Sequence, residues 1–248
     1  MLDVAREFNL SETAFALKLP LGKEADWAVR WFTPMVEDDL CGHATLATAH
    51  ALHADNPWPG VIRFGTRSGV LVAKLSRGWI TLDFPSAPAT RIPVPVGLGQ
   101  ALGAEPDATY ETGPLRDLLT VFATEDTVRA LAPNFQSLST LTRRDGIRGI
   151  TATAAASTRN FLYDFVSRFF SPADGIPEDP VTGSAHTALA PFWSQRLGRK
   201  RLTGLQVSSR PGHVRTEVRG DRVFLMGQAV TVWEGILSDS AEPGWTAV

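Results

Sequence analysis

The sequence predicts an α+β protein built from two pseudo-symmetric lobes, each a curved, mainly antiparallel sheet or barrel around a central helix. Three observations support this prediction: a motif that occurs twice in the 248-residue chain, an alanine-rich helix pattern after each copy, and a hairpin pattern after each helix. A chain of this length forms one large domain or two lobes of about 100–150 residues. The predicted lobes are residues 1–100 and 101–248, and we expect the end of the chain to return to the first lobe.

The repeated motif comes first in each lobe. Residues 30–34 read Arg-Trp-Phe-Thr-Pro and residues 168–172 read Arg-Phe-Phe-Ser-Pro, an offset of 138 positions. An acidic stretch follows each copy, at Glu37-Asp38-Asp39 and at Glu178-Asp179. Landmarks that recur at nearly the same offset indicate a duplicated lobe.

A helix pattern follows each acidic stretch and opens at a glycine. The first helix is expected from Gly42 to Leu52 and the second from Gly183 to Leu197. Both segments are rich in Ala, Thr and Leu and almost free of charge, which is typical of buried helices. We therefore expect strands to cover both helices on most sides.

Strand patterns complete each lobe. Residues 70–84 and 213–225 each contain two partly alternating β-branched runs around a turn with glycine, which predicts two hairpins. The segment from about Pro88 to Asp117 is rich in Pro, Gly and Ala and is predicted to cross between the lobes.

Composition narrows the class of function. The net charge is −2, and a protein without a basic excess is not expected to bind nucleic acid. No apolar run approaches the ~18 residues of a membrane-spanning helix, and the first residues do not resemble a secretory signal. The single cysteine, Cys41, excludes an internal disulfide and a Cys-rich zinc site. We therefore predict a cytoplasmic protein whose partner is a small molecule, with no nucleic acid and no membrane.

The two helix starts are the first candidate site. Unpaired backbone N–H groups and a partial positive charge at a helix N-terminus attract carboxylates and other anions. If the lobes face each other across a pseudo-two-fold axis, both helix starts converge on one cleft. His43, Asp179 and Ser184 would then line a pocket for a small anionic substrate. Asp179 taken alone is equally consistent with a simple helix N-cap.

Glu12 is a candidate acid/base because it stands just before a predicted strand among apolar residues. Partial burial would raise the pKa of its carboxyl group toward neutral, which suits proton transfer, although an exposed strand-end glutamate is the simpler interpretation. His43, His50 and His53 share the first helix but lack the spacing of metal ligands, so no metal is predicted. No nucleotide-binding loop and no serine-hydrolase motif occurs. Cys41 fits a small buried residue better than a nucleophile.

Five segments together resemble the PhzF-type phenazine-biosynthesis isomerase family. They are residues 9–15, 30–34, 39–47, 178–186 and 227–232, which lie in family order over nearly the whole chain. The resemblance implies a diaminopimelate-epimerase-like fold with the active site between the lobes. It also implies a cofactor-independent isomerase, commonly a homodimer, acting on a substrate such as trans-2,3-dihydro-3-hydroxyanthranilate.

The resemblance also implies roles for individual residues. Glu12 would be the acid/base that moves a proton between carbon atoms of the substrate. The residues that would line and orient the substrate come from both helix starts: Gly42, His43, Asp179, Gly183 and Ser184.

Two alternatives stay open. The first is an amino-acid racemase or epimerase on the same fold, with Glu12 and Asp179 as opposed bases; a two-thiol mechanism is disfavoured because Thr182 stands opposite Cys41 in the repeat. The second is a catalytically weak ligand-binding protein. It is suggested by the start of the sequence, which lacks the strand and Gly-Asn-Pro turn found at the start of family members. Such a lack would leave an unpaired sheet edge beside the site.

Overall fold

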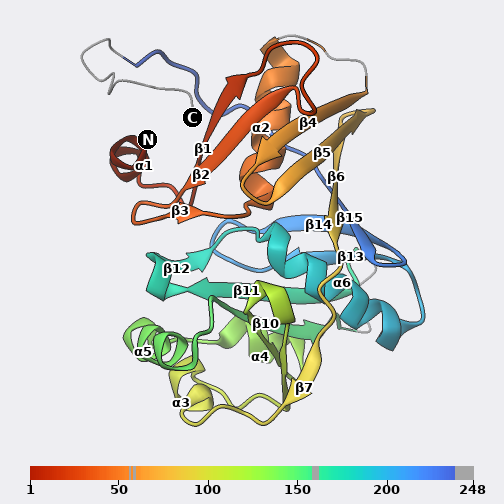
Figure 1. The fold of residues 1–248 in the computed structure, drawn as a ribbon. Helices are drawn as coiled ribbons and strands as arrows, with labels where there is room; N and C mark the ends of the chain where they lie inside the picture. Colours follow the sequence, from red (N-terminus) through yellow and green to blue (C-terminus); the bar gives the residue numbers. More distant parts are fainter. Residues whose placement is uncertain (56, 58–59, 158–161, 238–248) are drawn as a thin grey trace.

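The computed structural model describes residues 1–237 except 56, 58–59 and 158–161, and it shows two lobes stacked on each other (Figure 1). The first lobe contains α1 (Leu2–Phe8), β1 (Thr13–Lys18), β2 (Trp27–Phe32), β3 (Glu37–Asp38), α2 (Gly42–Asp55), β4 (Val61–Thr66), β5 (Gly69–Ser76) and β6 (Trp79–Pro85). The second contains β7 (Thr90–Ile92), α3 (Leu98–Leu102), β8 (Ala108–Glu111), β9 (Leu118–Val121), α4 (Glu125–Ala130), α5 (Phe135–Asp145), β10 (Ile150–Ala155), β11 (Phe165–Ser171), β12 (Ile176–Asp179), α6 (Gly183–Leu197), β13 (Arg201–Gln206), β14 (Gly212–Arg219) and β15 (Arg222–Gly227). Across these described residues, no helix is long and apolar enough to cross a membrane.

One continuous sheet runs through both lobes in the order β1-β2-β4-β5-β6-β15-β14-β13-β11-β10-β9-β8-β7, with β3 beside β2 and β12 beside β11. The pairing of β6 with β15 joins the lobes. Both predicted hairpins are present, as β5–β6 and β14–β15. Most neighbouring strands are antiparallel. Two parallel pairs occur at equivalent places in the two lobes, β2–β4 and β11–β13, and the second lobe has a further parallel pair, β9–β10. The predicted fold class is confirmed.

The duplicated motif forms the same local structure twice. Arg30 on β2 binds both carboxylate oxygens of Glu37, each at 2.8 Å, and Arg168 on β11 binds those of Glu178 at 2.7 and 2.9 Å. Each guanidinium group also lies over a phenylalanine ring two residues along its strand, at 5.2 and 5.0 Å from the ring centre. These contacts hold β3 against β2 and β12 against β11. Each acidic stretch is thereby fixed a few residues before its helix, α2 or α6.

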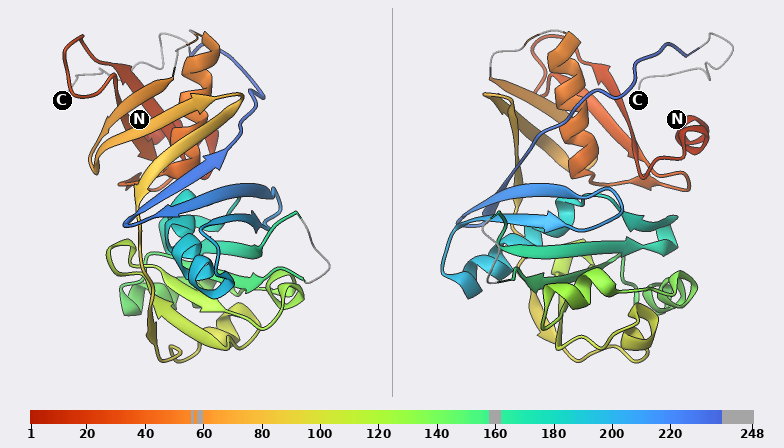
Figure 2. Two further views of the ribbon diagram at one scale, coloured as in Figure 1. Left: turned by 90° about the vertical axis from the view of Figure 1, so that its right-hand side faces the viewer. Right: turned by 180° about the vertical axis from the view of Figure 1, so that it is seen from behind.

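The two central helices are buried to different extents. Most of α6 is buried, and Leu189 on it has no exposed surface. The prediction that strands cover both helices on most sides is wrong for α2, where Ala47 and Ala51 are exposed. The physical reason is that the first-lobe sheet covers one side of α2. In the described part of the chain, the opposite side is crossed only by residues 228–237 (Figure 2).

A short strand before residue 100 pairs within the second-lobe sheet. This strand, β7, pairs with β8, while β6 pairs with β5 and β15. The segment from Pro88 to Asp117 is therefore more than a crossover, since it supplies β7, α3 and β8. β7 is an edge strand, and edge strands tolerate proline-rich surroundings. Residues 228–237 run back along α2, where Thr231 Oγ1 lies 3.2 Å from His50 Nε2.

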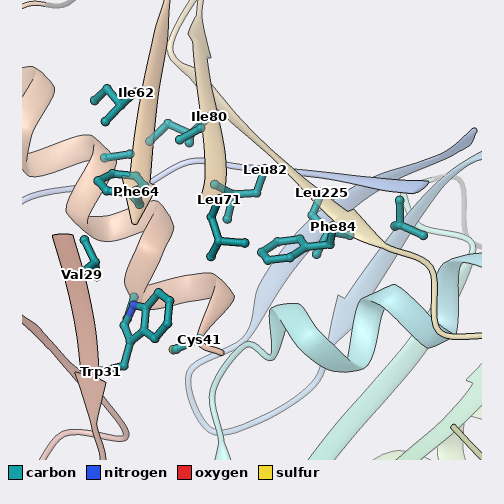
Figure 3. Packing of buried hydrophobic residues seen from close by; sticks show 14 of the residues in the cluster. Val29, Trp31, Cys41, Ile62, Phe64, Leu71, Ile80, Leu82, Phe84 and Leu225 are labelled. Carbon is teal, nitrogen blue, oxygen red and sulfur yellow. The ribbon is translucent and has the colours of Figure 1, made fainter. Parts of the chain in front are cut away.

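The first-lobe core packs between the curved sheet and the buried side of α2. Figure 3 shows its members, which include Trp31, Phe64 and Phe84 from three strands and Leu225 from β15. Cys41 belongs to this cluster and is 3% exposed, as expected for a small buried residue at the start of a helix. The core thus fixes the first turn of α2 and continues to the junction with the second lobe.

Candidate active site

The first turns of α2 and α6 meet at the centre of the molecule. A Cβ atom built on Gly42 would lie 2.9 Å from Cα of Gly183, and one built on Gly183 would lie 2.8 Å from Cα of Gly42. Only glycine allows two backbones to approach this closely. The structure therefore places two helix N-termini, each with unpaired backbone N–H groups, side by side at the pseudo-two-fold axis.

A cavity of about 830 Å³ opens at these helix starts, between the lobes. Its volume suits a small-molecule ligand. The sequence-predicted residues all line it: Glu12, Gly42, His43, Asp179, Gly183 and Ser184. The structure thus brings together residues that lie up to 172 positions apart in the chain.

Glu12 is held in place by the end of α1. Asn9 adopts a left-handed conformation that ends the helix, and Glu12 follows directly before β1. Its carboxylate is 6% exposed, and Oε2 lies 3.1 Å from Nε2 of His43 on the first turn of α2. The other ring nitrogen of His43 lies 3.9 Å from Oδ2 of Asp179, which belongs to the second lobe. His43 therefore stands between two carboxylates.

Burial of the Glu12 carboxylate would raise its pKa, but contact with the His43 imidazole and its charge, with smaller effects of Ser11 and Arg148, outweighs burial and lowers it. The expected upward shift of the Glu12 pKa is therefore wrong. The pKa of Asp179 is raised, because burial outweighs the charge of His43 and the hydrogen bond from Thr182. Two carboxylates in one cluster are thus shifted in opposite directions, which is the pattern of an acid and a base with distinct tasks.

The pKa of His43 is raised well above its usual value. Burial of the ring lowers it, but the neighbouring Cys41, Glu12 and Asp179 raise it by more. Burial raises the pKa of the Cys41 thiol to about 12, so this thiol is uncharged near neutral pH. The contact with the Glu12 carboxylate at 3.1 Å therefore favours the protonated form of His43. The protonated imidazole in turn keeps Glu12 ionised.

The start of α6 is organised by two further contacts. The Thr182 hydroxyl donates to Oδ2 of Asp179, and Oδ1 of Asp179 is buried without a hydrogen-bond partner in the described part of the protein. Arg148 donates from Nη2 to the Ser184 hydroxyl oxygen at 3.0 Å and binds the buried Asp117 at 2.9 and 2.7 Å. Arg148 therefore fixes the hydroxyl of Ser184 and adds positive charge to the anion-binding end of the cavity.

Arg148 and Asp38 are among the cavity residues that the sequence analysis did not identify. Arg148 lies in the loop before β10 and belongs to no recognisable motif, so nothing in the sequence marks it. Asp38 also lines the cavity, and here a signal existed. In the repeat, Glu37-Asp38 aligns with Glu178-Asp179, so the choice of Asp179 as a site residue also points to Asp38.

The site also contains one group of side chains with metal-ligand chemistry. Ligand atoms of Glu12, Cys41 and His43 all lie within 4.8 Å of one another. A carboxylate, a thiolate and an imidazole can together bind zinc. His50 and His53, further along α2, are not part of this group.

Comparisons with known proteins show the family to which the chain belongs. Residues 1–235 match the family model PhzC-PhzF, described as phenazine biosynthesis-like protein. A Pseudomonas aeruginosa protein named as an uncharacterized isomerase is 45% identical over 235 residues, which are 94% of this chain and 85% of that protein.

Solved structures give the same result. A PhzF family protein of Enterococcus faecalis is 39% identical, with a TM-score of 0.80 over 92% of this chain and 82% of that one. A PhzC/PhzF protein of Clostridium difficile is 36% identical, with a TM-score of 0.82 over 96% and 86%. A probable proline racemase of Agrobacterium radiobacter shares the fold alone, at 13% identity and a TM-score of 0.61. The chain therefore belongs to the PhzC-PhzF family of phenazine biosynthesis-like proteins.

Proposed function

We propose that this protein is a cofactor-independent isomerase that moves a proton on a small carboxylate-bearing substrate, with Glu12 as its acid/base. Family membership and the relatives named as isomerases support an isomerase or epimerase in general terms. The observation that carries the specific proposal is the position of Glu12. Its buried, ionised carboxylate lines the cavity beside two helix N-termini.

The paired helix starts suit the carboxylate of the substrate. Backbone N–H groups at Gly42 and Gly183 are free of intrahelical partners, and the helix dipoles favour a negative charge there. The Ser184 hydroxyl, held by Arg148, adds a further polar contact. A substrate anchored in this way presents its adjacent carbon atoms toward Glu12.

The reaction then needs only one proton. The ionised carboxylate of Glu12 takes a proton from a substrate carbon, and the electron pair of the broken C–H bond enters the adjacent π system. The same carboxyl group returns the proton to another carbon, where a new C–H bond forms. The substrate and product have the same composition, so the step is balanced without an oxidant or reductant. His43 holds the Glu12 carboxylate in its ionised, oriented form between proton transfers.

The test is proton NMR in D₂O with trans-2,3-dihydro-3-hydroxyanthranilate as the probe substrate. We expect loss of substrate with deuterium uptake at carbon, and a fall of roughly 10²-fold or more in Glu12→Gln. Glu7→Gln is the matched control, since Glu7 is exposed on α1 and lies outside the cavity lining. Turnover close to wild type in Glu12→Gln would exclude the acid/base role.

A racemase or epimerase is the second candidate. It is favoured by the position of Glu12 and Asp179 in one cavity, one from each lobe, where two carboxyl groups could act as acid and base on a substrate between them. It predicts exchange of the α-proton of an amino acid with solvent, lost in both Glu12→Gln and Asp179→Asn. Binding of carboxylates without any exchange or turnover would indicate a ligand-binding protein instead. A homodimer remains a prediction.

A further inference from the structure

Asp38 occupies the same place in the first lobe as Asp179 in the second. Asp38 pairs with Trp31 across β3 and β2, and Asp179 pairs with Phe169 across β12 and β11. Trp31 and Phe169 are the second residues of the two motif copies. Both aspartates line the cavity. The duplication therefore gives the cavity two carboxylates related by the pseudo-two-fold axis.

The partners of these two carboxylates differ. Asp179 has the Thr182 hydroxyl and the imidazole of His43. The residue equivalent to Thr182 in the lobe of Asp38 is Cys41, which has no hydroxyl group. The residue equivalent to His43 across the lobes is Ser184, which carries no charge.

What remains for Asp38 is contact with the backbone N–H groups of Leu40 and Asp39. Its Oδ1 accepts a hydrogen bond from the backbone of Leu40 at 3.4 Å, and no cationic side chain of the described residues lies within 4.0 Å of it. Arg148 acts on it only through longer-range charge, since its guanidinium group binds Asp117.

The acidic residues on either side of Asp38 in the cavity lining are paired with arginine side chains. Glu37 is bound by Arg30 and lies 3.4 Å from Arg67, and Asp39 lies 3.5 Å from Arg67. Burial without a counter-ion raises the pKa of Asp38 to about 6, so it is mostly ionised at pH 7 and above. A half-buried, ionised carboxylate without a cation is unfavourable, and a cationic hydrogen-bond donor from outside the protein would offset that cost.

We propose that Asp38 is a specificity-determining residue that binds a protonated amino group of the substrate. The substrate class is then an aliphatic amino carboxylate, whose carboxylate lies at the helix starts and whose ammonium group contacts Asp38. This inference rests on the proposed function for the carboxylate end of the substrate, and it adds the group that selects among carboxylates. trans-2,3-Dihydro-3-hydroxyanthranilate, with amino and carboxyl groups on adjacent ring carbons, belongs to this class.

The experiment compares two saturated probes that cannot be isomerised: trans-2-aminocyclohexanecarboxylate and cyclohexanecarboxylate, which differ only in the amino group. Binding to the full chain is measured at pH 7.5 by ligand-observed NMR titration. A charge-assisted hydrogen bond contributes about 1.5–3 kcal/mol, so the wild type should bind the amino probe about 10-fold to 100-fold more tightly. Asp38→Asn should reduce this preference to about 2-fold or less, whereas Asp39→Asn, the matched control, should retain it.

Asp38→Ser serves as a second variant, and thermal unfolding checks that each variant is folded. Equal binding of both probes to the wild type, or a preference that survives in both Asp38 variants, overturns the role of Asp38 and leaves the carboxylate site standing. Loss of the preference in Asp39→Asn also overturns the role of Asp38, since the preference would then come from the negative charge of residues 37–39 as a whole. Failure of both probes to bind the wild type overturns this inference. Turnover in the Glu12→Gln experiment then decides separately whether the proposed isomerase function stands.

Discussion

The two lobes begin with the same contacts and end with different helices. The ion pair of Arg30 with Glu37 is repeated by Arg168 with Glu178, with nearly identical distances. The helix that follows is largely buried in the second lobe, where α6 packs on β13, β14 and β15, whereas α2 is half-exposed. The difference shows that a duplicated motif fixes where a helix starts, while the neighbouring strands decide how far it is buried.

The same comparison explains the chemistry of the site. Position by position, the first lobe supplies Cys41 and His43, where the second supplies Thr182 and Ser184. His43 pairs with Asp179 across the lobes, but Ser184 cannot pair with Asp38 in the same way. A symmetric scaffold thus carries an asymmetric set of charges, which a reaction with a distinct acid and base requires.

The largest expected difference between the lobes is in how much a truncated side chain on each central helix lowers the free energy of unfolding. Leu189 on α6 has no exposed surface, and its replacement by Ala should cost about 2–5 kcal/mol of the free energy of unfolding. Leu52 on α2 is only partly buried, so Leu52→Ala should cost about half as much or less. Urea unfolding followed by circular dichroism measures both. Equal costs would mean that α2 is as well covered in solution as α6.

Local sequence signals predicted the parts of the fold that depend on local structure. The repeated motif, the glycine at each helix start and the glycine-containing turns identify both lobes, both helix starts and both hairpins. Burial of α2 was predicted wrongly, because its Ala-rich composition does not report how many strands lie around it. β7, α3 and β8 were also missed, since a short edge strand among prolines lacks the alternating pattern of a central strand.

Among the site residues, those in local motifs could be identified from the sequence, whereas effects of contacts between distant residues could not. Glu12, His43 and Asp179 lie within motifs, and the structure places all three at one cavity. The direction of the Glu12 pKa shift was wrong because it depends on His43, which reaches Glu12 only through the fold. Arg148 was missed for the same reason: its partners, Asp117 and Ser184, lie 31 and 36 positions away without any pattern that joins them.

The uncompensated charge of Asp38 should appear in the pH dependence of stability. Burial raises the pKa of Asp38 from its usual value of 3.8 to about 6 in the folded protein, so the folded state favours the protonated form. This stabilisation is fully present below about pH 4 and is lost as the pH rises through about 6. Asp38→Asn should therefore match the wild type near pH 4 and exceed it by about 1–3 kcal/mol at pH 8.

Urea unfolding of both proteins across this pH range provides the measurement. Asp39→Asn is the control, because Asp39 is the next residue in the chain and its side chain is 70% exposed. A constant difference between Asp38→Asn and the wild type at all pH values would contradict the raised pKa. It would also remove the electrostatic reason for an external cation at Asp38.

Substitutions at the contact between Gly42 and Gly183 should destabilise the protein equally from either lobe. A methyl group on either residue would meet the backbone of the other at 2.9 or 2.8 Å, so each Gly→Ala change forces α2 and α6 apart. Overpacking of this kind costs about 1–3 kcal/mol, partly offset by the better helix propensity of alanine, about 1 kcal/mol. The two costs should be equal despite the different burial of the helices, because one contact is shared.

The double variant sharpens this prediction. Once the helices have moved apart for the first methyl group, the second enters space that is already open. The combined loss in the free energy of unfolding should therefore be smaller than the sum of the single losses, as expected for residues in direct contact. Strictly additive losses would show that the two helix starts are not pressed together in solution. The two sets of helix N–H groups would then no longer form a single anion-binding end of the cavity.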